Sequence, residues 1–570
     1  MHHGLRLVLA VALTCGALSA RAAWTPPDTA QLARLERALA SPHAQWDPTE
    51  QMLKRPFSSP GYHTTLKGGF VHATRDAFTY AVGLLDTGKP AHLDRACAIL
   101  RRVIALQDSD PVSKTHGIWS WFLEEPLAKM SPPDFNWADF NGVSLLQVAR
   151  DHHARLPADL AAAVDTSILR ACAAIKKRNV GPGYTNIAIM GTYVTLVAGE
   201  LLSNDESRTY GLERLARFHA YTRDNGTFEE YNSPTYTIIA LLELSRLKAH
   251  VRTPSAQPLI DDLLRHTWQE IATHFHAPTR QWAGPHSRAY RSLYSHGTLA
   301  LIQRATAGRV DFGVDAPDRE ELRLPVHCPP DLAPLFTSLT TPRTVTETFI
   351  QRSHTVGTTY LHPAFALGSI NHGDLWNQRR PLLAHFGTAA APGYLQLRFL
   401  KNDYDFSSAI FHGTQREGLV VGAVNLITNG GDTHISLDKV KQAKIRARDL
   451  RLRFELGGPA AKNAALTLTS PTHATLTAGE LTFHVTLAHA RLGDLTGKLS
   501  AGQAGDLRFL DVEFYHGPER EFDLALLGEA LTAFALSVGP HGPATTQTDA
   551  GKLTLTCDAL TVSAATKPSP

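Results

Sequence analysis

The sequence predicts a multidomain α+β protein, in which an N-terminal (α/α) toroid of helical hairpins precedes a C-terminal antiparallel β-sandwich. At 570 residues the chain is too long for one compact core, so two domains are expected. From about residue 30 to 304 the apolar residues recur with a helical period. From about residue 340 onward, short alternating runs separated by Gly, Asp and Asn turns replace that pattern.

Residues 1–22 are expected to be a secretory signal peptide. Arg6 is followed by an apolar run from Leu7 to Leu18, and small residues then offer cleavage after Ala20 or Ala22. No later stretch is apolar enough to span a membrane. The mature protein is therefore expected to be periplasmic or secreted.

Residues 23–335 are expected to form the toroid. The segment 157–177 shows its pattern clearly, because Leu160, Val164, Ile168 and Cys172 fall on one helical stripe. Similar stripes occur near 74–86, 91–107, 138–156, 185–203, 207–223, 234–249, 256–274 and 293–306. Antiparallel helices joined by short loops pack as hairpins, and the absence of a fixed-period repeat favours a toroid over an open array.

Residues 336–565 are expected to form the sandwich, after a proline-rich connection that runs from Pro325 to Pro334. Runs such as 481–487 and 552–556 alternate apolar and polar side chains, as strands with one buried face do. Many such strands in succession predict an antiparallel β-sandwich.

Composition excludes some classes of partner. The 56 Lys+Arg nearly balance the 53 Asp+Glu and form no dense basic stripe, which argues against nucleic acid. The 28 His show no His-Glu-x-x-His spacing, and the four Cys beyond residue 22 form no Cys-x-x-Cys pair. No metal-ligand set is therefore predicted and no cofactor is expected, while the oligomeric state stays open.

Three polar clusters, spaced about fifty residues apart, each precede every second predicted helix. In a barrel of hairpins these helix starts lie on one rim, so the clusters are expected to converge. The first reads Tyr184-Thr185-Asn186, and Asn186 falls in the first turn of the 185–203 helix. Its amide could donate to a substrate carboxylate, or Thr185 and Asn186 could simply cap the helix.

The second cluster holds Glu229, Glu230, Tyr231, Asn232 and Tyr236. Tyr236 falls in the first turn after a Ser-Pro helix start, where the helix dipole would stabilise a phenolate. Either carboxylate could serve as acid or base, or be solvated. The two tyrosines could instead be half-buried packing residues.

The third cluster holds His286, Arg288 and Tyr290 after a Gly-Pro turn. The arginine fork suits a carboxylate or sulfate, and histidine carries protons near neutral pH. An exposed basic loop is the alternative.

A fourth segment could complete the rim ahead of the 138–156 helix. It contains Trp119, Trp121, Asn136, Trp137 and Asp139, and aromatic faces beside polar groups are typical of sugar-binding clefts. The tryptophans could also be core anchors, and Asp139 only a helix cap.

The order Asn, then Asn-Gly-Thr-Phe with a Tyr, then Gly-x-x-Ser-Arg resembles the polysaccharide lyases of the hyaluronate, chondroitin and xanthan lyase group. The resemblance covers about one hundred residues and implies a helical toroid followed by antiparallel sheets. It also implies that Asn186 neutralises a uronate carboxylate, that Arg288 assists, and that Tyr236 is the acid/base. Tyr231 stands where the family has a histidine, so His286 is the candidate for the missing imidazole.

The sandwich half contains one polar segment, from Gly368 to Pro381, that is costly to bury unpaired. It either packs at the domain interface, which we expect, or forms the far wall of the cleft. His412 and His434 are weaker candidates of the same kind.

These observations lead to three functional hypotheses. The first is a lyase that cleaves an acidic polysaccharide by β-elimination. The second is a glycoside hydrolase that uses Asp139 with Glu229 or Glu230. The third is a non-catalytic glycan-binding protein, which would keep the aromatic cleft but need no proton-transfer groups.

Overall fold

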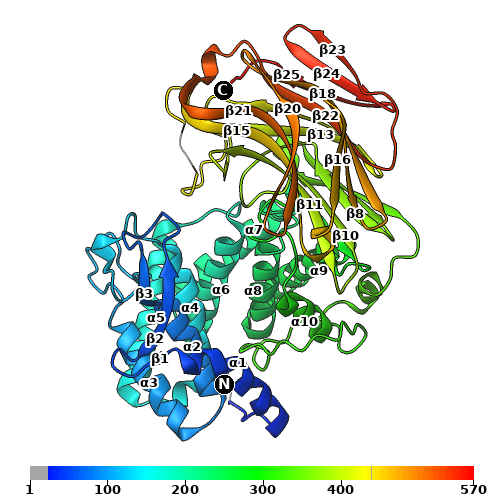
Figure 1. The fold of residues 1–570 in the computed structure, drawn as a ribbon. Coiled ribbons are helices and arrows are strands. Elements are labelled where there is room, and N and C mark those ends of the chain that lie inside the picture. Colours follow the sequence, from blue (N-terminus) through cyan, green and yellow to red (C-terminus); the bar gives the residue numbers. More distant parts are fainter. Residues whose placement is uncertain (1–23, 438–439) are drawn as a thin grey trace, which may run out of the picture.

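The computed structural model describes residues 24–437 and 440–570, so the expected signal peptide, residues 1–22, lies outside the described residues. Helices make up most of the first half and antiparallel strands the second, and the sandwich stands on one end of the helical domain (Figure 1). This confirms the predicted fold class. In the described part of the chain, no helix combines the length and the apolar character that crossing a membrane requires.

The helical domain is a series of antiparallel hairpins in two layers. Its helices are α1 (Thr29–Ala44), α2 (Thr74–Asp86), α3 (Pro90–Ile104), α4 (Asn136–Gln147), α5 (Ala158–Arg178), α6 (Thr185–Leu201), α7 (Asp205–Asn225), α8 (Tyr236–His250), α9 (Gln257–Thr273) and α10 (His296–Ala305). The inner helices α2, α4, α6 and α8 pack side by side, and α3, α5, α7 and α9 each cover an inner partner. All inner helices therefore begin on the same rim.

The pair α6 and α7 shows how sequence sets these layers. Residues 185–199 of α6 are all buried, as expected for an inner helix that is apolar on every side. The two helices approach closely at Gly199 and Gly211. A Cβ at Gly199 would lie 2.3 Å from the backbone nitrogen of Arg208, and one at Gly211 would lie 2.6 Å from that of Leu196. Side chains at these positions would push the layers apart.

Strands that the helical pattern did not reveal lie inside the first domain. The three-stranded sheet β1 (Trp46–Asp47), β2 (Met52–Ser58) and β3 (Gly68–His72) precedes α2, and β4 (Phe275–His276) pairs with β5 (Gln281–Trp282). Pro56 lies within β2, and a proline weakens the sequence signal for a strand. The β2–β3 connection, residues 59–67, is the part of this sheet that reaches the cleft described below.

The sandwich contains two large antiparallel sheets and a smaller one. One sheet has the order β20-β21-β15-β11-β10-β8-β7-β6, and the other has the order β16-β17-β18-β22-β14-β13-β9. The sheet β23-β24-β25 packs on the outer face of the second one through Leu553 and Leu555. The strand bounds are β6 (Arg343–Ile350), β7 (Thr355–His362), β8 (Phe365–Ile370), β9 (His372–Asp374), β10 (Leu382–Gly387), β11 (Pro392–Lys401), β12 (Tyr404–Asp405), β13 (Ala409–Arg416), β14 (Leu419–Leu426), β15 (Lys444–Gly457), β16 (Ala465–Ser470), β17 (His473–Ala478), β18 (Leu481–Leu492), β19 (Leu495–Thr496), β20 (Lys498–Ala504), β21 (Leu507–Asp523), β22 (Ala530–Val538), β23 (Thr545–Asp549), β24 (Lys552–Cys557) and β25 (Leu560–Ala565).

The two halves are joined by a tightly packed interface. Tyr231, from the loop before α8, stacks on Phe349 of β6 with ring centroids 4.4 Å apart and planes 7° from parallel. The backbone of His286 pairs with that of Arg380 through two hydrogen bonds of 3.0 and 2.9 Å. These contacts hold the sandwich against the rim on which the inner helices begin.

Candidate active-site cleft

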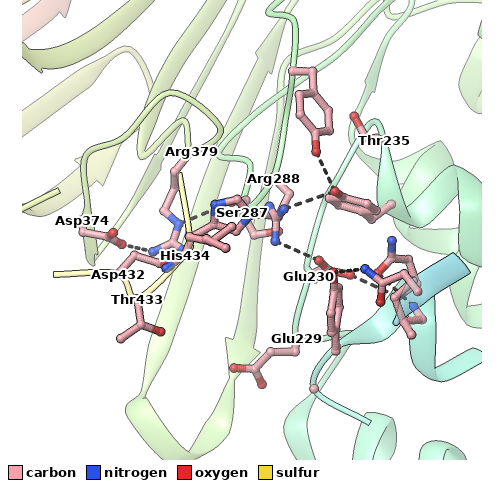
Figure 2. Close-up of a pocket in the computed structure, with 18 of the residues that line it drawn as sticks. Glu229, Glu230, Thr235, Ser287, Arg288, Asp374, Arg379, Asp432, Thr433 and His434 are labelled. Carbon is pink, nitrogen blue, oxygen red and sulfur yellow. Dashed lines mark hydrogen bonds and ion pairs between the residues drawn. The ribbon is translucent and has the colours of Figure 1, made fainter. Parts of the chain in front are cut away.

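A cleft of about 1140 Å³ opens between the toroid rim and the sandwich. The starts of α4, α6 and α8 contribute to its toroid wall, together with the loop at 287–290 and the β2–β3 connection. The opposite wall comes from residues 372–379 and from the connection between β14 and β15. In Figure 2, Arg288 and Glu230 lie on the toroid side, and Asp374, Arg379 and His434 face them from the sandwich side.

Arg288 is the central group of the cleft. Its Nη1 donates to Glu230 Oε1 at 3.2 Å (Figure 2). Its Nη2 donates to the Tyr236 hydroxyl at 3.2 Å and its Nε to Gln378 Oε1 at 2.9 Å. The guanidinium carbon lies 4.7 Å from the Tyr236 ring centroid and 5.5 Å from that of Trp376. Because all three nitrogens are engaged in different directions, the plane of the guanidinium is fixed before any ligand binds.

Glu230 connects Arg288 to the start of α6. Its Oε2 accepts the Asn186 backbone N–H at 3.1 Å, so the carboxylate sits at the positive end of the helix. Burial raises the pKa of Glu230 to about 7, against the opposing effects of Arg288 and that N–H. The Asn186 side-chain oxygen accepts from the Ile187 N–H at 2.9 Å. Its Nδ2 is therefore the atom available to a ligand.

Tyr236 and Tyr290 form a hydroxyl pair. Their oxygens are 2.8 Å apart, and Tyr236, the first residue of α8, is anchored by a 2.9 Å bond from its N–H to Ser233 Oγ. Burial raises the pKa of Tyr236 more than Arg288 lowers it. The expectation of a phenolate stabilised by the helix start is therefore corrected: in the free protein Tyr236 is a neutral phenol, which suits a proton donor. Tyr290 is 55% exposed and borders the opening.

His286 does not reach the cleft, contrary to the sequence-based expectation. Its side chain is 2% exposed, and both ring nitrogens lack hydrogen-bond partners among the described residues. Burial, followed by nearby His385 and Arg380, lowers its pKa well below the usual histidine range. The backbone pairing with Arg380 places this side chain in the interface between the two halves.

His434 supplies an imidazole on the opposite wall instead. It lies on the β14–β15 connection, with its Nδ1 2.6 Å from Ser436 Oγ and its ring centroid 5.1 Å from that of Trp376. Partial burial, and then Arg288, lower the pKa of His434, while Asp432 opposes them. The ring is therefore neutral near pH 7. Its Nδ1 accepts the Ser436 N–H at 3.2 Å, so the ring proton lies on Nε2 and the lone pair that can take a proton is on Nδ1.

The polar segment from Gly368 to Pro381 occupies both of the places that the sequence left open, the domain interface and the far wall of the cleft. Arg380 packs at the interface, as expected, whereas Asp374 and Arg379 line the cleft. Arg379 donates to Asp432 Oδ2 at 3.0 Å and forms an ion pair with Asp374 (Figure 2). The segment therefore contributes to the far wall as well as to the interface.

The predicted aromatic wall is present only in part. Trp121 lines the cleft and stacks on Trp137, with ring centroids 5.1 Å apart and planes 27° from parallel. Trp137 supports it from behind through a 3.0 Å bond to Thr74 Oγ1. Trp119 is a core residue, fully buried with its Nε1 donating to Val103 O at 2.9 Å, so its expected substrate contact is wrong. Asn136 lines the cleft and donates to the Tyr184 hydroxyl at 3.3 Å.

Asp139 and Asn232 are buried outside the cleft, which corrects their expected contact with substrate. Asp139 is 2% exposed, and burial raises its pKa to about 7. Asn232 is fully buried and donates to the carbonyls of Ala283 and Pro285 at 3.0 and 2.7 Å. Its role is therefore to hold the third cluster in place.

The neighbouring residues of the second cluster do line the cleft. Tyr231 does so from its stack on Phe349, and burial raises its pKa to about 12. Glu229 accepts from the Tyr221 hydroxyl at 2.5 Å and forms an ion pair with Arg352.

Sequence reasoning missed several cleft residues: Tyr62, His63, Arg75 and Arg178. Tyr184, the first residue of the first polar cluster, lines the cleft as well. Tyr62 and His63 follow a Ser-Ser-Pro-Gly turn, which gave a loop signal but no indication of where the loop lies. Arg75 belongs to α2, another inner helix that begins on the rim, and its guanidinium lies 3.8 Å from the Phe140 ring centroid.

Comparisons with known proteins agree with this architecture. A family model described as a domain of unknown function (DUF8769) matches residues 44–307. No curated protein matches the sequence. A chondroitin AC lyase of Streptomyces coelicolor A3, solved in complex with chondroitin sulphate, matches with a TM-score of 0.49 and 12% identity, over 95% of this chain and 85% of that one. Heparinase III matches with a TM-score of 0.50 and 10% identity, over 95% of this chain and 91% of that one. The chain therefore has a fold similar to that of heparinase III, which confirms, for the fold, the resemblance to lyases with a toroid and a sandwich.

Proposed function

We propose that the protein is a secreted or periplasmic polysaccharide lyase that cleaves a uronic-acid-containing glycan by β-elimination in this cleft. The observation that carries the proposal is the contact of Arg288 with both Tyr236 and Glu230. It places a fixed cation beside a phenol that holds a proton, in a cleft large enough for several sugar rings. The toroid, residues 23–335, and the sandwich, residues 336–565, are proposed as the two domains that form the walls.

The chemical difficulty of β-elimination is the weak acidity of the proton next to the uronate carboxylate. Hydrogen-bond donors that neutralise the carboxylate stabilise the negative charge that develops when this proton leaves. Arg288 supplies a guanidinium and Asn186 its amide Nδ2 at the start of α6. Both groups lie on the toroid wall and are held by Glu230, so they need little reorganisation during the reaction.

Two further groups divide the proton transfers. His434, which is neutral at pH 7, takes the proton from the carbon next to the carboxylate, and a carbon–carbon double bond forms as the bond to the glycosidic oxygen breaks. Tyr236 gives its proton to that leaving oxygen, and Arg288 stabilises the phenolate that results. The products are a new chain end on one fragment and an unsaturated uronate on the other, with atoms and charges balanced.

Two other hypotheses have less support from the geometry. A hydrolase needs two carboxyl groups that flank the scissile bond, and Asp139, one of the expected pair, is buried outside the cleft. The other two carboxylates expected for a hydrolase, Glu229 and Glu230, are already engaged by Arg352 and Arg288. A protein that only binds glycans would not need a phenol, an imidazole and a guanidinium in one cleft.

The deciding experiment incubates the mature protein with a panel of uronate polysaccharides and follows ultraviolet absorbance and reducing ends in parallel. An elimination produces the absorbing unsaturated uronate together with each new reducing end. Reducing ends without absorbance would establish hydrolysis and refute the proposal. Neither signal, combined with measurable glycan retention, would favour a binding protein.

A further inference from the structure

Two histidines and a glutamate converge on the far side of the N-terminal helices, outside the cleft. Glu36 and His43 lie two turns apart on the same face of α1, and His92 lies in the first turn of α3. One potential ligand atom from each lies within 4.8 Å of the others, and the two imidazole centroids are 5.3 Å apart. The three side chains are 15 to 29% exposed, so solvent and small ions can reach them.

Both imidazoles are already oriented by hydroxyl groups on their Nδ1 atoms. Thr87 Oγ1 donates its proton to the Leu84 carbonyl at 2.7 Å. His92 Nδ1, 2.9 Å from the same oxygen, must therefore donate its own proton, which leaves a lone pair on Nε2. The same Nδ1 lies 4.0 Å from Glu36 Oε1, so the His92 ring has to turn to bring Nε2 toward the carboxylate. His43 Nδ1 lies 2.8 Å from the Tyr80 hydroxyl. Outer partners that fix the ring and tautomer in this way are typical of metal-binding histidines.

The distance between His43 and Glu36 suits a small tetrahedral ion. His43 Nε2 lies 3.5 Å from Glu36 Oε2. Two ligands each about 2.0–2.1 Å from a tetrahedral Zn²⁺ are separated by roughly 3.3–3.4 Å, so this pair needs almost no movement. The Lys89 ammonium, 2.6 Å from Glu36 Oε1, now neutralises the carboxylate. Its side chain is 46% exposed and can turn toward water when a divalent cation takes its place.

We propose that Glu36, His43 and His92 form a binding site for a divalent transition-metal ion, for which Zn²⁺ is the best fit. Two imidazoles and one carboxylate are a ligand set that zinc uses, with water in the fourth position. The ion would join α1 to α3, and because the ligands come from both helices, binding would stabilise the folded state. The site is independent of the proposed lyase activity.

The experiment is a calorimetric titration of the tag-free, chelator-treated mature protein with zinc chloride, combined with thermal unfolding. We expect one equivalent to bind and to raise the melting temperature. His43→Gln and His92→Gln should each abolish the saturable binding. His153→Gln is the matched control. His153 pairs with Asp165 at 3.0 Å, but among the described residues the two have no third potential ligand beside them. This variant should bind zinc as the wild type does.

Two more variants keep the test decisive if a histidine variant folds poorly. Thr87→Val removes the hydroxyl behind His92 and should weaken zinc binding about tenfold. Lys89→Met removes the competing ammonium and should tighten it. No saturable binding by the folded wild type, or unchanged affinity in Lys89→Met and in both histidine variants, would show that the cluster is an ordinary ion pair with two packed imidazoles.

Discussion

The guanidinium of Arg288 both donates to the hydroxyl of Tyr236, at 3.2 Å, and lies 4.7 Å from the centroid of its ring. The cation is therefore placed to stabilise a phenolate at the moment when Tyr236 releases its proton. The guanidinium contributes little while the phenol is neutral, and burial keeps the phenol neutral in the free protein. A group whose charge is favoured only during proton transfer contributes to catalysis rather than to ground-state binding.

Replacement of the Tyr236 hydroxyl should therefore remove turnover and leave glycan binding. Tyr236→Phe keeps the ring beside Arg288 but has no proton to give, so kcat should fall by about 10² to 10⁴. The measurement is the initial rate of unsaturated-uronate formation, with KM as the second readout. Tyr515→Phe, whose hydroxyl donates to the Pro518 carbonyl far from the cleft, is the matched control. A normal kcat in Tyr236→Phe would show that the proton comes from elsewhere.

His434 and His286 offer a direct comparison between an imidazole that lines the cleft and one that does not. His434→Gln should lose about 10² to 10⁴ in kcat, because the base is gone. His286→Gln should keep the kcat of its folded fraction, and any effect should appear in thermal stability.

The wild-type pH profile should support the same assignment. His434 is active when neutral, so activity should fall as the pH drops through its pKa, and that pKa is lowered. The acidic fall should therefore begin below the usual histidine range. An inactive His286→Gln together with an active His434→Gln would reverse the assignment.

Variants at Glu229 and Glu230 distinguish the lyase hypothesis from the hydrolase hypothesis. Glu230→Gln leaves Arg288 without its counter-charge and disturbs the bond to the Asn186 N–H, so kcat/KM should fall but stay measurable. Glu229→Gln, the neighbouring control, loses an ion pair at the rim with Arg352, whose side chain is 60% exposed, and should change kcat/KM little. Complete loss of cleavage in either variant, with reducing ends as the only wild-type product, would favour hydrolysis.

Local periodicity was sufficient to predict the architecture and much of the toroid wall. Helix starts that alternate between two rims brought Asn136, Asn186, Tyr236, Arg288 and Tyr290 to one cleft, and this follows from the order of the hairpins alone. The same reasoning could not distinguish side chains within a loop. Trp119 and Trp121 are two residues apart, yet only the first reaches the Val103 carbonyl of α3 in the core.

The rest of the site depends on contacts between segments far apart in the sequence. His286 is withdrawn by backbone pairing with Arg380, a residue of the other half of the chain. His434 lies on a long connection that no periodic pattern marks, and it is positioned by packing against Trp376. Such placements come from tertiary packing, which a local sequence pattern does not encode.

Glu270 predicts how stability depends on pH. It is a buried carboxyl that accepts from Thr227 Oγ1, Thr237 Oγ1 and the Asn232 N–H at 2.5, 2.9 and 3.1 Å, and no cation pairs with it among the described residues. Burial raises its pKa from 4.5 to about 7, although these hydrogen bonds oppose the shift. Between about pH 4.5 and about pH 7, Glu270 is therefore protonated in the folded state and ionised in the unfolded state. This proton stabilises the folded state fully below about pH 4.5. The contribution, about 3 kcal/mol of the free energy of unfolding at most, is lost as the pH rises toward 7.

Glu270→Gln removes this titration, so its melting temperature should fall less steeply than that of the wild type between about pH 5 and about pH 8. The slope is the readout, because the amide also changes the hydrogen bonds to the three donors and shifts absolute stability. Glu480→Gln, at the exposed turn between β17 and β18, should keep the wild-type slope. Equal slopes in wild type and Glu270→Gln would mean that Glu270 is ionised in the folded protein. In that case the loop that carries Asn232 and the second cluster would be held by a charged acceptor rather than by a neutral one.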